Sequence, residues 1–211
     1  MLKKILVSLM IPIFCACAGT VPGKPTDTPL PPPTSAPSEP SMVAQSQSAE
    51  ISSDEQAVYS VFFAEKPDVT LLLQDTASDS SMTSSQEVMD FIKSGLPAVS
   101  DETINAYLMN NKQDSQLSAS MNVGVEYQLL SADEFAEISS QSDWGNVLKE
   151  KYPGSNGYMF FSRVGFNNAH DQALIYVGRV YGPLAGEASY YLLEKKDARW
   201  MIVNQILRVT S

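Results

Sequence analysis

The stretch from Gly157 to Ser211 constrains the fold more than any other, because apolar runs separated by turn residues follow one another there. Residues 158–166, 172–180, 188–195 and 200–209 have the apolar and aromatic content of strands. The second run is apolar at nearly every position, which is typical of a central strand covered on both faces. Because the connections are short, the four runs predict consecutive antiparallel strands, a four-stranded meander.

The residues before the meander predict mainly helices. Helical spacing and capping residues predict helices at 51–66, 84–95, 101–108, 131–138 and 143–152. Two shorter runs predict strands at 69–75 and 123–129. Helices first and strands last are typical of α+β proteins. The predicted fold is therefore α+β, with several N-terminal helices packed on a curved antiparallel sheet that ends in the four-stranded meander. A single domain is expected to span residues 49–211.

The first residues have the pattern of a bacterial secretory signal. Lys3 and Lys4 precede an apolar run that is too short to span a bilayer, so residues 1–16 predict a cleaved signal peptide. The segment ending in Ala16 and Cys17 resembles a bacterial lipobox, in which the cysteine is lipidated with fatty acids such as palmitate. Phe14 departs from that pattern, since lipoboxes usually carry Leu at this place, and an ordinary secretory signal is the alternative.

Residues 17–48 are rich in Pro, Ser and Thr and contain few apolar residues. This composition predicts a disordered, lipid-anchored tether between the membrane and the domain. The expected localisation is the bacterial cell envelope, on the outside of a membrane, and the outer membrane if the cell is Gram-negative. The membrane is thus the first expected partner, through the N-terminal lipid.

Charge and cysteine content exclude several classes of partner. The net charge is −10, which repels nucleic-acid phosphates, so no nucleic-acid binding is expected. Both cysteines, Cys15 and Cys17, lie before the domain, so the domain has no disulfide and no thiolate metal site. Neither a phosphate-binding glycine loop nor a calcium loop occurs, and no metal or cofactor is predicted.

The motifs FSRVGFN, QALIYVG, GPLAG and YYLLEKKDARWMIV resemble those of a family of exported bacterial proteins without an established activity. The resemblance covers residues 50–211 and is strongest after Trp144. It implies export and an α+β fold, and it implies no catalytic role. In many members two cysteines bracket the glycine turn; Tyr181 and Ala185 stand at those places here, so no disulfide or metal role is implied.

No group of side chains predicts a catalytic site. His170 lies beside Asp171 in a turn, and no nucleophile-elbow pattern surrounds Ser162. Three acidic pairs are candidates for acid–base chemistry, namely Asp54 with Glu55, Asp133 with Glu134 and Glu187 with Glu194. The first two pairs lie at predicted helix N-termini, where the helix dipole already accounts for them.

Aromatic and arginine side chains on adjacent predicted strands form the remaining candidate site. Most are expected in the core, but a curved sheet can leave an aromatic-lined pocket; the candidate ligand-binding residues are Arg163, Arg179, Tyr176, Tyr181 and Tyr190. The sequence therefore predicts a non-catalytic ligand- or protein-binding module of the cell envelope, whose ligand is a small molecule, a peptide or a protein. The alternatives are an envelope hydrolase with carboxylate-based chemistry and an inhibitor or immunity-type protein.

Overall fold

The computed structural model of the chain describes residues 50–63, 71–79, 84–182 and 185–210. The predicted signal peptide, Cys17 and the predicted tether lie outside these residues. In the part of the chain that is described, no helix is both long enough and apolar enough to cross a membrane.

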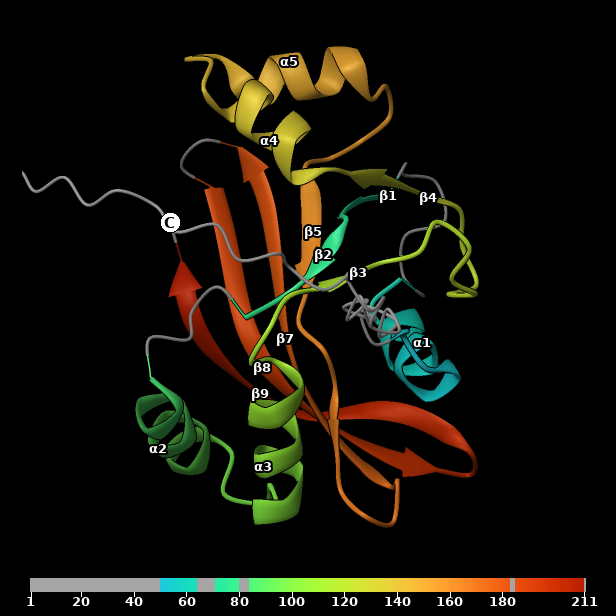
Figure 1. Cartoon of the computed structure of the whole chain (residues 1–211), viewed down its shortest axis with the longest axis vertical. Coiled ribbons are helices and arrows are strands. Elements are labelled where there is room, and N and C mark those ends of the chain that lie inside the picture. Colours follow the sequence, from blue (N-terminus) through green and yellow to red (C-terminus); the bar gives the residue numbers. More distant parts are fainter. Residues whose placement is uncertain (1–49, 64–70, 80–83, 183–184, 211) are drawn as a thin grey trace, which may run out of the picture. The chain divides into compact units, whose positions relative to one another are not determined.

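A mixed sheet of seven strands forms the centre of the domain (Figure 1). Six strands follow the order β4-β1-β5-β7-β8-β9, and β6 pairs with β7 at the side of this path. The strands are β1 Leu71–Gln74, β4 Tyr127–Leu130, β5 Tyr158–Phe161, β6 Gly165–Phe166, β7 Gln172–Gly182, β8 Ala185–Lys196 and β9 Arg199–Thr210. A separate two-stranded sheet joins β2 (Thr76–Ala77) to β3 (Ser115–Gln116).

The C-terminal meander confirms the predicted antiparallel pairing. Tyr190 of β8 lies opposite Tyr176 of β7 on one side and Ile206 of β9 on the other. Residues 173–178 of β7 are all buried, as expected for a central strand. Together with the helices described below, this sheet confirms the α+β fold class.

The N-terminal half of the sheet differs from the predicted antiparallel arrangement. β1 pairs in parallel with both β4 and β5. Leu73 of β1 lies opposite Leu129 of β4 on one side and opposite Met159 of β5 on the other. Helices occupy the connections from β1 to β4 and from β4 to β5. Such long crossovers bring the next strand back in the same direction, which a short hairpin cannot do.

The first predicted meander strand, 158–166, is interrupted between β5 and β6. In the gap the backbone N–H of Arg163 donates to Oδ1 of Asn111 at 2.8 Å. Because this group bonds to a side chain instead of a neighbouring strand, the strand ladder stops there and resumes at Gly165.

Serine residues fix the start of four helices. The side chain before each helix accepts a hydrogen bond from a backbone N–H in the first turn, which satisfies one of the free donors there. These helices are α1 Ser53–Ser60, α2 Ser85–Gly95, α3 Asp101–Asn110 and α4 Ala132–Ser139, capped by Ser52, Ser84, Ser100 and Ser131. The fifth, α5 Trp144–Lys151, begins without a side-chain cap. The helix predicted over 51–66 ends at Ser60, and the last residues of that prediction lie outside the described part.

Each face of the sheet packs against a different set of helices (Figure 1). Side chains of α2 and α3 cover Leu174, Tyr176 and Tyr190 on one face. Side chains of α1 cover Ile175 and Leu193 on the other. Helices α4 and α5 pack together near β5 at the opposite end from α2 and α3, in a smaller cluster.

Candidate ligand-binding site

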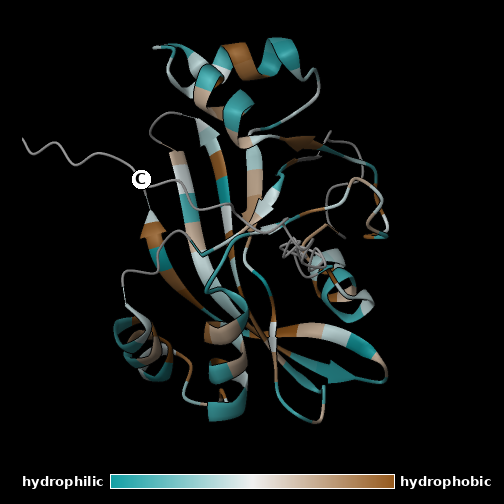
Figure 2. Cartoon of the chain, viewed as in Figure 1, coloured by the Kyte–Doolittle hydropathy of each residue, from teal (hydrophilic) through white to brown (hydrophobic). Residues whose placement is uncertain are grey.

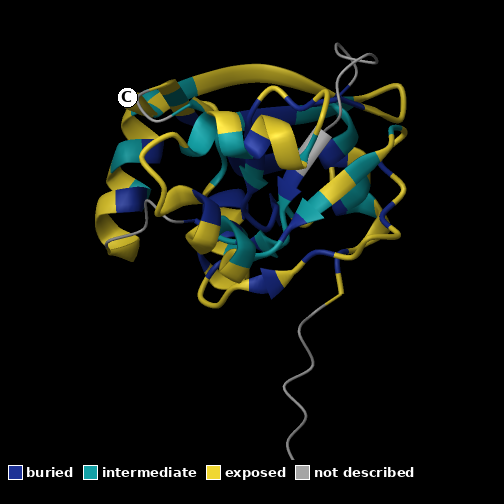
Figure 3. Ribbon diagram, turned by 90° about the horizontal axis from the view of Figure 1, so that it is seen from above, coloured by how far each residue is buried: buried dark blue, intermediate teal, exposed yellow. Residues whose placement is uncertain are grey.

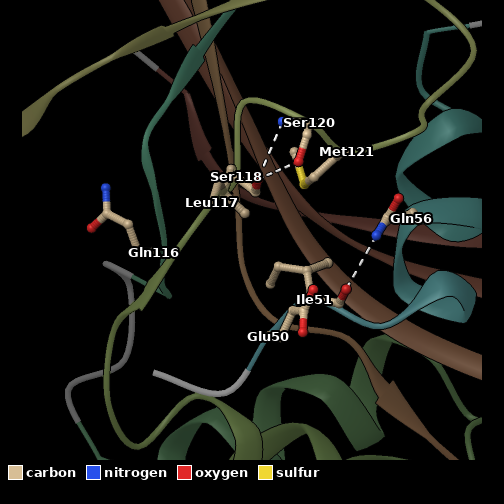
Figure 4. Close-up of a pocket in the computed structure, with 8 residues that line it drawn as sticks. All are labelled: Glu50, Ile51, Gln56, Gln116, Leu117, Ser118, Ser120 and Met121. Carbon is tan, nitrogen blue, oxygen red and sulfur yellow. Dashed lines mark hydrogen bonds between the residues drawn. The ribbon is translucent and has the colours of Figure 1, made fainter. Parts of the chain in front are cut away.

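A hollow of about 340 Å³ lies between the beginning of α1 and the segment that follows β3 (Figure 4). Its lining comes from two short stretches that are far apart in the sequence: Glu50, Ile51 and Gln56 from the first, and Gln116, Leu117, Ser118, Ser120 and Met121 from the second. This volume is within the range of small-molecule sites, which is about 300–1,000 Å³.

The floor of the hollow is apolar because three of its side chains belong to the core. Ile51, Leu117 and Met121 are 5%, 3% and 7% exposed and pack in the same cluster as α1. The start of α1 is fixed by a capping box, in which Ser52 Oγ accepts from the N–H of Glu55 and Ser52 N–H donates to the Glu55 carboxylate. These contacts hold one wall of the hollow in place.

Side chains also hold the opposite wall. The Tyr127 hydroxyl donates to the carbonyl of Ser118 at 2.6 Å and accepts from the N–H of Met121 at 2.8 Å. Burial raises the pKa of this hydroxyl, and the bond from Met121 opposes that shift only in part. The amide of Gln56 links the walls, since it accepts from the N–H of Asn122 at 2.7 Å and donates to the carbonyl of Ile51 at 3.1 Å.

The rim offers hydroxyl and amide groups and one carboxylate. The exposed rim residues are Glu50, Gln116, Ser118 and Ser120, and the two serine hydroxyls lie 2.8 Å apart. Hydroxyls and amides both donate and accept hydrogen bonds, as sugars and peptides require. The lining that the structure describes contains no histidine, lysine, arginine or cysteine. Apolar side chains beside hydroxyls and amides are suited to binding a ligand.

Sequence reasoning missed this hollow because nothing in the second stretch is unusual by itself. Residues 116–121 are small, polar or apolar in no regular order. The hollow arises only when β3 brings them beside the first turn of α1. Its one local signal is the Ser118–Ser120 pair, which is a common turn pattern.

The structure does not bring the five predicted ligand-binding residues together. Arg163 lies in the interior, 8% exposed, where its guanidinium holds both carboxylate oxygens of Glu55 at 2.7 and 2.8 Å and donates to Ser115 Oγ at 3.0 Å. The bonds to Glu55 raise the pKa of Arg163 further. Arg163 thus closes a network between α1, β3 and the gap after β5.

Tyr176 and Tyr190 lie on the other face of the sheet, under α2 and α3, and are fully buried. The hydroxyls of Tyr190 and Tyr107 both donate to Oδ2 of Asp79, at 2.7 and 2.6 Å. Burial, followed by the charge of Asp79, holds the pKa of Tyr107 well above its usual value. Asp79 is therefore a buried acceptor for two tyrosines.

Arg179 and Tyr181 lie towards the end of β7, away from Arg163 and from the buried Tyr176 and Tyr190. The Arg179 guanidinium donates to the carbonyl of Phe62 at 3.3 Å, and Tyr181 is 36% exposed. Tyr191 packs edge-on against Phe62, with ring centroids 4.9 Å apart. This part of the sheet is the one place where predicted ligand-binding residues reach the surface.

The candidate catalytic groups are also dispersed. His170 pairs with Asp54, with 3.3 Å between Nδ1 and Oδ2, and its ring stacks on Phe166. Its sequence neighbour Asp171 instead bonds to Asn167. The Ser162 hydroxyl is buried and bonded to the backbone on both sides.

The acidic pairs separate as well. Asp54 faces His170, whereas Glu55 faces Arg163, and Glu134 pairs with Lys151 at 2.6 Å. The contact with Lys151 lowers the pKa of Glu134. Within the described ranges no three acidic, histidine or cysteine side chains come close enough to hold a metal ion.

Comparison with known proteins gives no relative for this chain. No protein-family model matches it. No curated protein matches it, and no solved structure matches it.

Proposed function

We propose that the chain is a non-catalytic ligand-binding module of the bacterial cell envelope and that the hollow beside α1 holds the ligand. The observation that carries the proposal is the combination of an apolar floor with a rim of amides and hydroxyls. Ligand sites commonly join apolar walls to a few polar groups that fix orientation. The lipobox-like segment ending at Cys17 supports an envelope location.

The rim indicates the chemistry of the ligand. Gln116, Ser118 and Ser120 fit hydroxyl and amide groups, and Glu50 together with a net charge of −10 disfavours anions. A neutral or cationic ligand that carries such groups, either a glycan or a peptide, satisfies these conditions. Envelope polymers supply both.

Gln116 offers a sharp test, because its side chain is exposed on the rim. The full chain, purified in detergent, is titrated by calorimetry with a soluble disaccharide–tetrapeptide fragment of peptidoglycan whose carboxyl groups are amidated, so that it is not anionic. The disaccharide and the tetrapeptide, amidated in the same way, are titrated separately. We expect saturable binding of the fragment, and we expect Gln116→Trp to weaken it at least about tenfold by filling the hollow, which is about 1.4 kcal/mol.

Gln113→Trp is the matched control, since Gln113 is equally exposed in the same segment but does not line the hollow. It should bind as the parent does. The comparison of the three probes separates glycan recognition from peptide recognition. The proposal fails if none of the probes binds saturably, or if both tryptophan variants bind as the parent does.

The hydrolase alternative has less support. It needs two carboxylates that face one pocket, and of the residues described as lining the hollow only Glu50 is acidic. Asp54 and Glu55 point to separate partners, His170 and Arg163. We therefore rank binding ahead of hydrolysis.

A further inference from the structure

Strand β9 forms one end of the sheet path, beside β8. It is twelve residues long, and no strand in the described part of the chain pairs with its outer side. A long free edge presents a row of backbone donors and acceptors that can pair with another chain. Natural proteins usually shorten or charge such an edge, so its length here requires an explanation.

The same strand carries most of the large apolar side chains that reach the surface. Seven such residues are exposed in the described part of the chain, and five of them lie on β9: Met201 52%, Ile202 40%, Val203 41%, Leu207 54% and Val209 47%. Figure 2 shows hydrophobic colour on β9 near the C-terminus, and Figure 3 shows exposed ribbon reaching that end of the chain. Exposed apolar residues gathered in this way are typical of a docking surface.

Four of these five residues are spaced symmetrically about Gln205 when positions are counted in the register with β8. In the register with β8, Gln205 lies opposite Tyr191. Ile202 and Leu207 lie two register positions away on either side, opposite Leu193 and Ser189. Met201 and Val209 lie three positions away, opposite Glu194 and Ala188. Each pair also shares a face of the sheet, because both members are an equal number of positions from the centre.

We propose that two copies of this chain associate by antiparallel pairing of their β9 strands, with a two-fold axis at Gln205. If the bulged residues Val203 and Arg208 are left out of the count, as they are in the register with β8, antiparallel pairing about that axis sets Ile202 of each copy against Leu207 of the other, and Met201 against Val209. A two-fold interface must be self-complementary, and the symmetric spacing about Gln205 meets this requirement. The pairing joins the two sheets into one.

The two register shifts in β9 lie on either side of the residues proposed to make the central contacts. Val203 and Arg208 are the residues without a partner in the register with β8, which marks them as bulges. The run from Asn204 to Leu207 between them keeps regular register. This run contains the axis. A central hydrogen bond from the N–H of Gln205 would replace the bond that this group now donates to Asn204 Oδ1 at 2.8 Å.

Charge favours a second copy at this edge over other parts of the surface. β9 contains Arg199 and Arg208 but no acidic residue, although the chain carries a net charge of −10. Two copies therefore meet here without opposing carboxylates on the paired strands. In the proposed register neither arginine lies opposite the other, so no like charges face each other directly.

A cysteine on the axis tests the geometry. Residues directly opposite in an antiparallel pair have Cα atoms about 4.5–5.5 Å apart, which a disulfide can bridge. We expect Gln205→Cys in the full chain to give a crosslinked dimer under mild oxidation, beyond any formed by the parent with Cys15 and Cys17. Met109→Cys is the control, since Met109 is 66% exposed on α3 and lies on no strand.

A charge swap tests the partner positions. Ile202→Glu with Leu207→Glu places like charges opposite each other at two symmetric positions, and it should raise the dimer dissociation constant at least about tenfold. Ile202→Lys with Leu207→Glu places opposite charges there and should restore association. Sedimentation velocity over a concentration series measures both, and circular dichroism checks that each variant is folded.

The outcomes separate a second copy from other occupants. The proposal is overturned if the parent chain stays monomeric at every concentration and Gln205→Cys forms no crosslink. The occupant of the edge would then be an extended segment of another protein. A dimer that both charge variants leave intact also overturns it, because the interface then lies elsewhere. The test is independent of the ligand hollow, whose residues lie outside β9.

Discussion

Glu55 joins the start of α1 to the gap between β5 and β6 through one carboxylate. Its oxygens accept from the backbone N–H of Ser52, from the guanidinium of Arg163 and from the backbone N–H of Val164. The Glu55 and Arg163 side chains are only 4% and 9% exposed. Since two buried charges are tolerated only when they satisfy each other, this pair fixes α1 against the gap between β5 and β6.

Removing one member of the pair should destabilise the domain strongly. We expect Glu55→Gln to lower the free energy of unfolding by about 3–5 kcal/mol, because it leaves the Arg163 charge buried without its partner. Urea unfolding measures the change. Glu102→Gln, at an exposed carboxylate in the first turn of α3, should change stability by less than about 1 kcal/mol. An equal effect of the two substitutions would show that the buried pair contributes nothing particular.

At the scale of the elements, glycine determines how closely α3 approaches the sheet. A Cβ atom at Gly165 of β6 would meet the backbone of Tyr107 well inside van der Waals contact. The approach brings Tyr107 to the position from which its hydroxyl reaches Asp79. The short strand β6 is thus shaped by the helix that packs on it.

Gly165→Ala should therefore destabilise the domain by about 1–3 kcal/mol, since backbone atoms of α3 must move to admit the methyl group. Gly182→Ala is the matched control, because a Cβ atom there meets nothing within 4 Å. Thermal unfolding of the two variants gives the comparison. If Gly165→Ala unfolds at the same temperature as Gly182→Ala, the close approach is not a constraint on the fold.

At the scale of the whole molecule, the order of segments predicts an anchor, a tether and a binding domain. The three parts have different compositions: apolar in residues 1–16, proline-rich in 17–48 and mixed after residue 49. Lipid attachment at Cys17 would hold the domain near the membrane while the tether lets it reach ligands at a distance. Dimerisation through β9 would add a second anchor to each assembly.

Cys17→Ser should release the protein from membranes, since the lipid is lost with the thiol. Fractionation of cells into membrane and soluble material, followed by immunoblotting, measures the change. Cys15→Ser keeps the proposed lipid site and should remain in the membrane fraction. Retention of the Cys17→Ser protein on membranes would contradict the lipoprotein proposal.

The sequence alone predicted the α+β class, the helix starts at Ser84 and Ser131 and the antiparallel meander. These features depend on local alternation, capping and turn residues, which act over a few positions. The parallel pairing of β1, by contrast, depends on contacts between Leu73 and residues far along the chain. Nothing near Leu73 in the sequence reveals that direction.

The functional residues divide in the same way. The sequence identified Arg163, Tyr176 and Tyr190 as candidate ligand-binding residues. The structure buries all three and bonds Arg163 to Glu55 and Tyr190 to Asp79. The hollow beside α1 and the exposed edge of β9 consist of residues that form no recognisable motif in the sequence. They form a surface only together with their neighbours in space. Helix caps, turns and strand alternation depend on consecutive residues, so the sequence alone predicts them. The hollow and the exposed edge exist only after distant segments have packed, so only the tertiary structure reveals them.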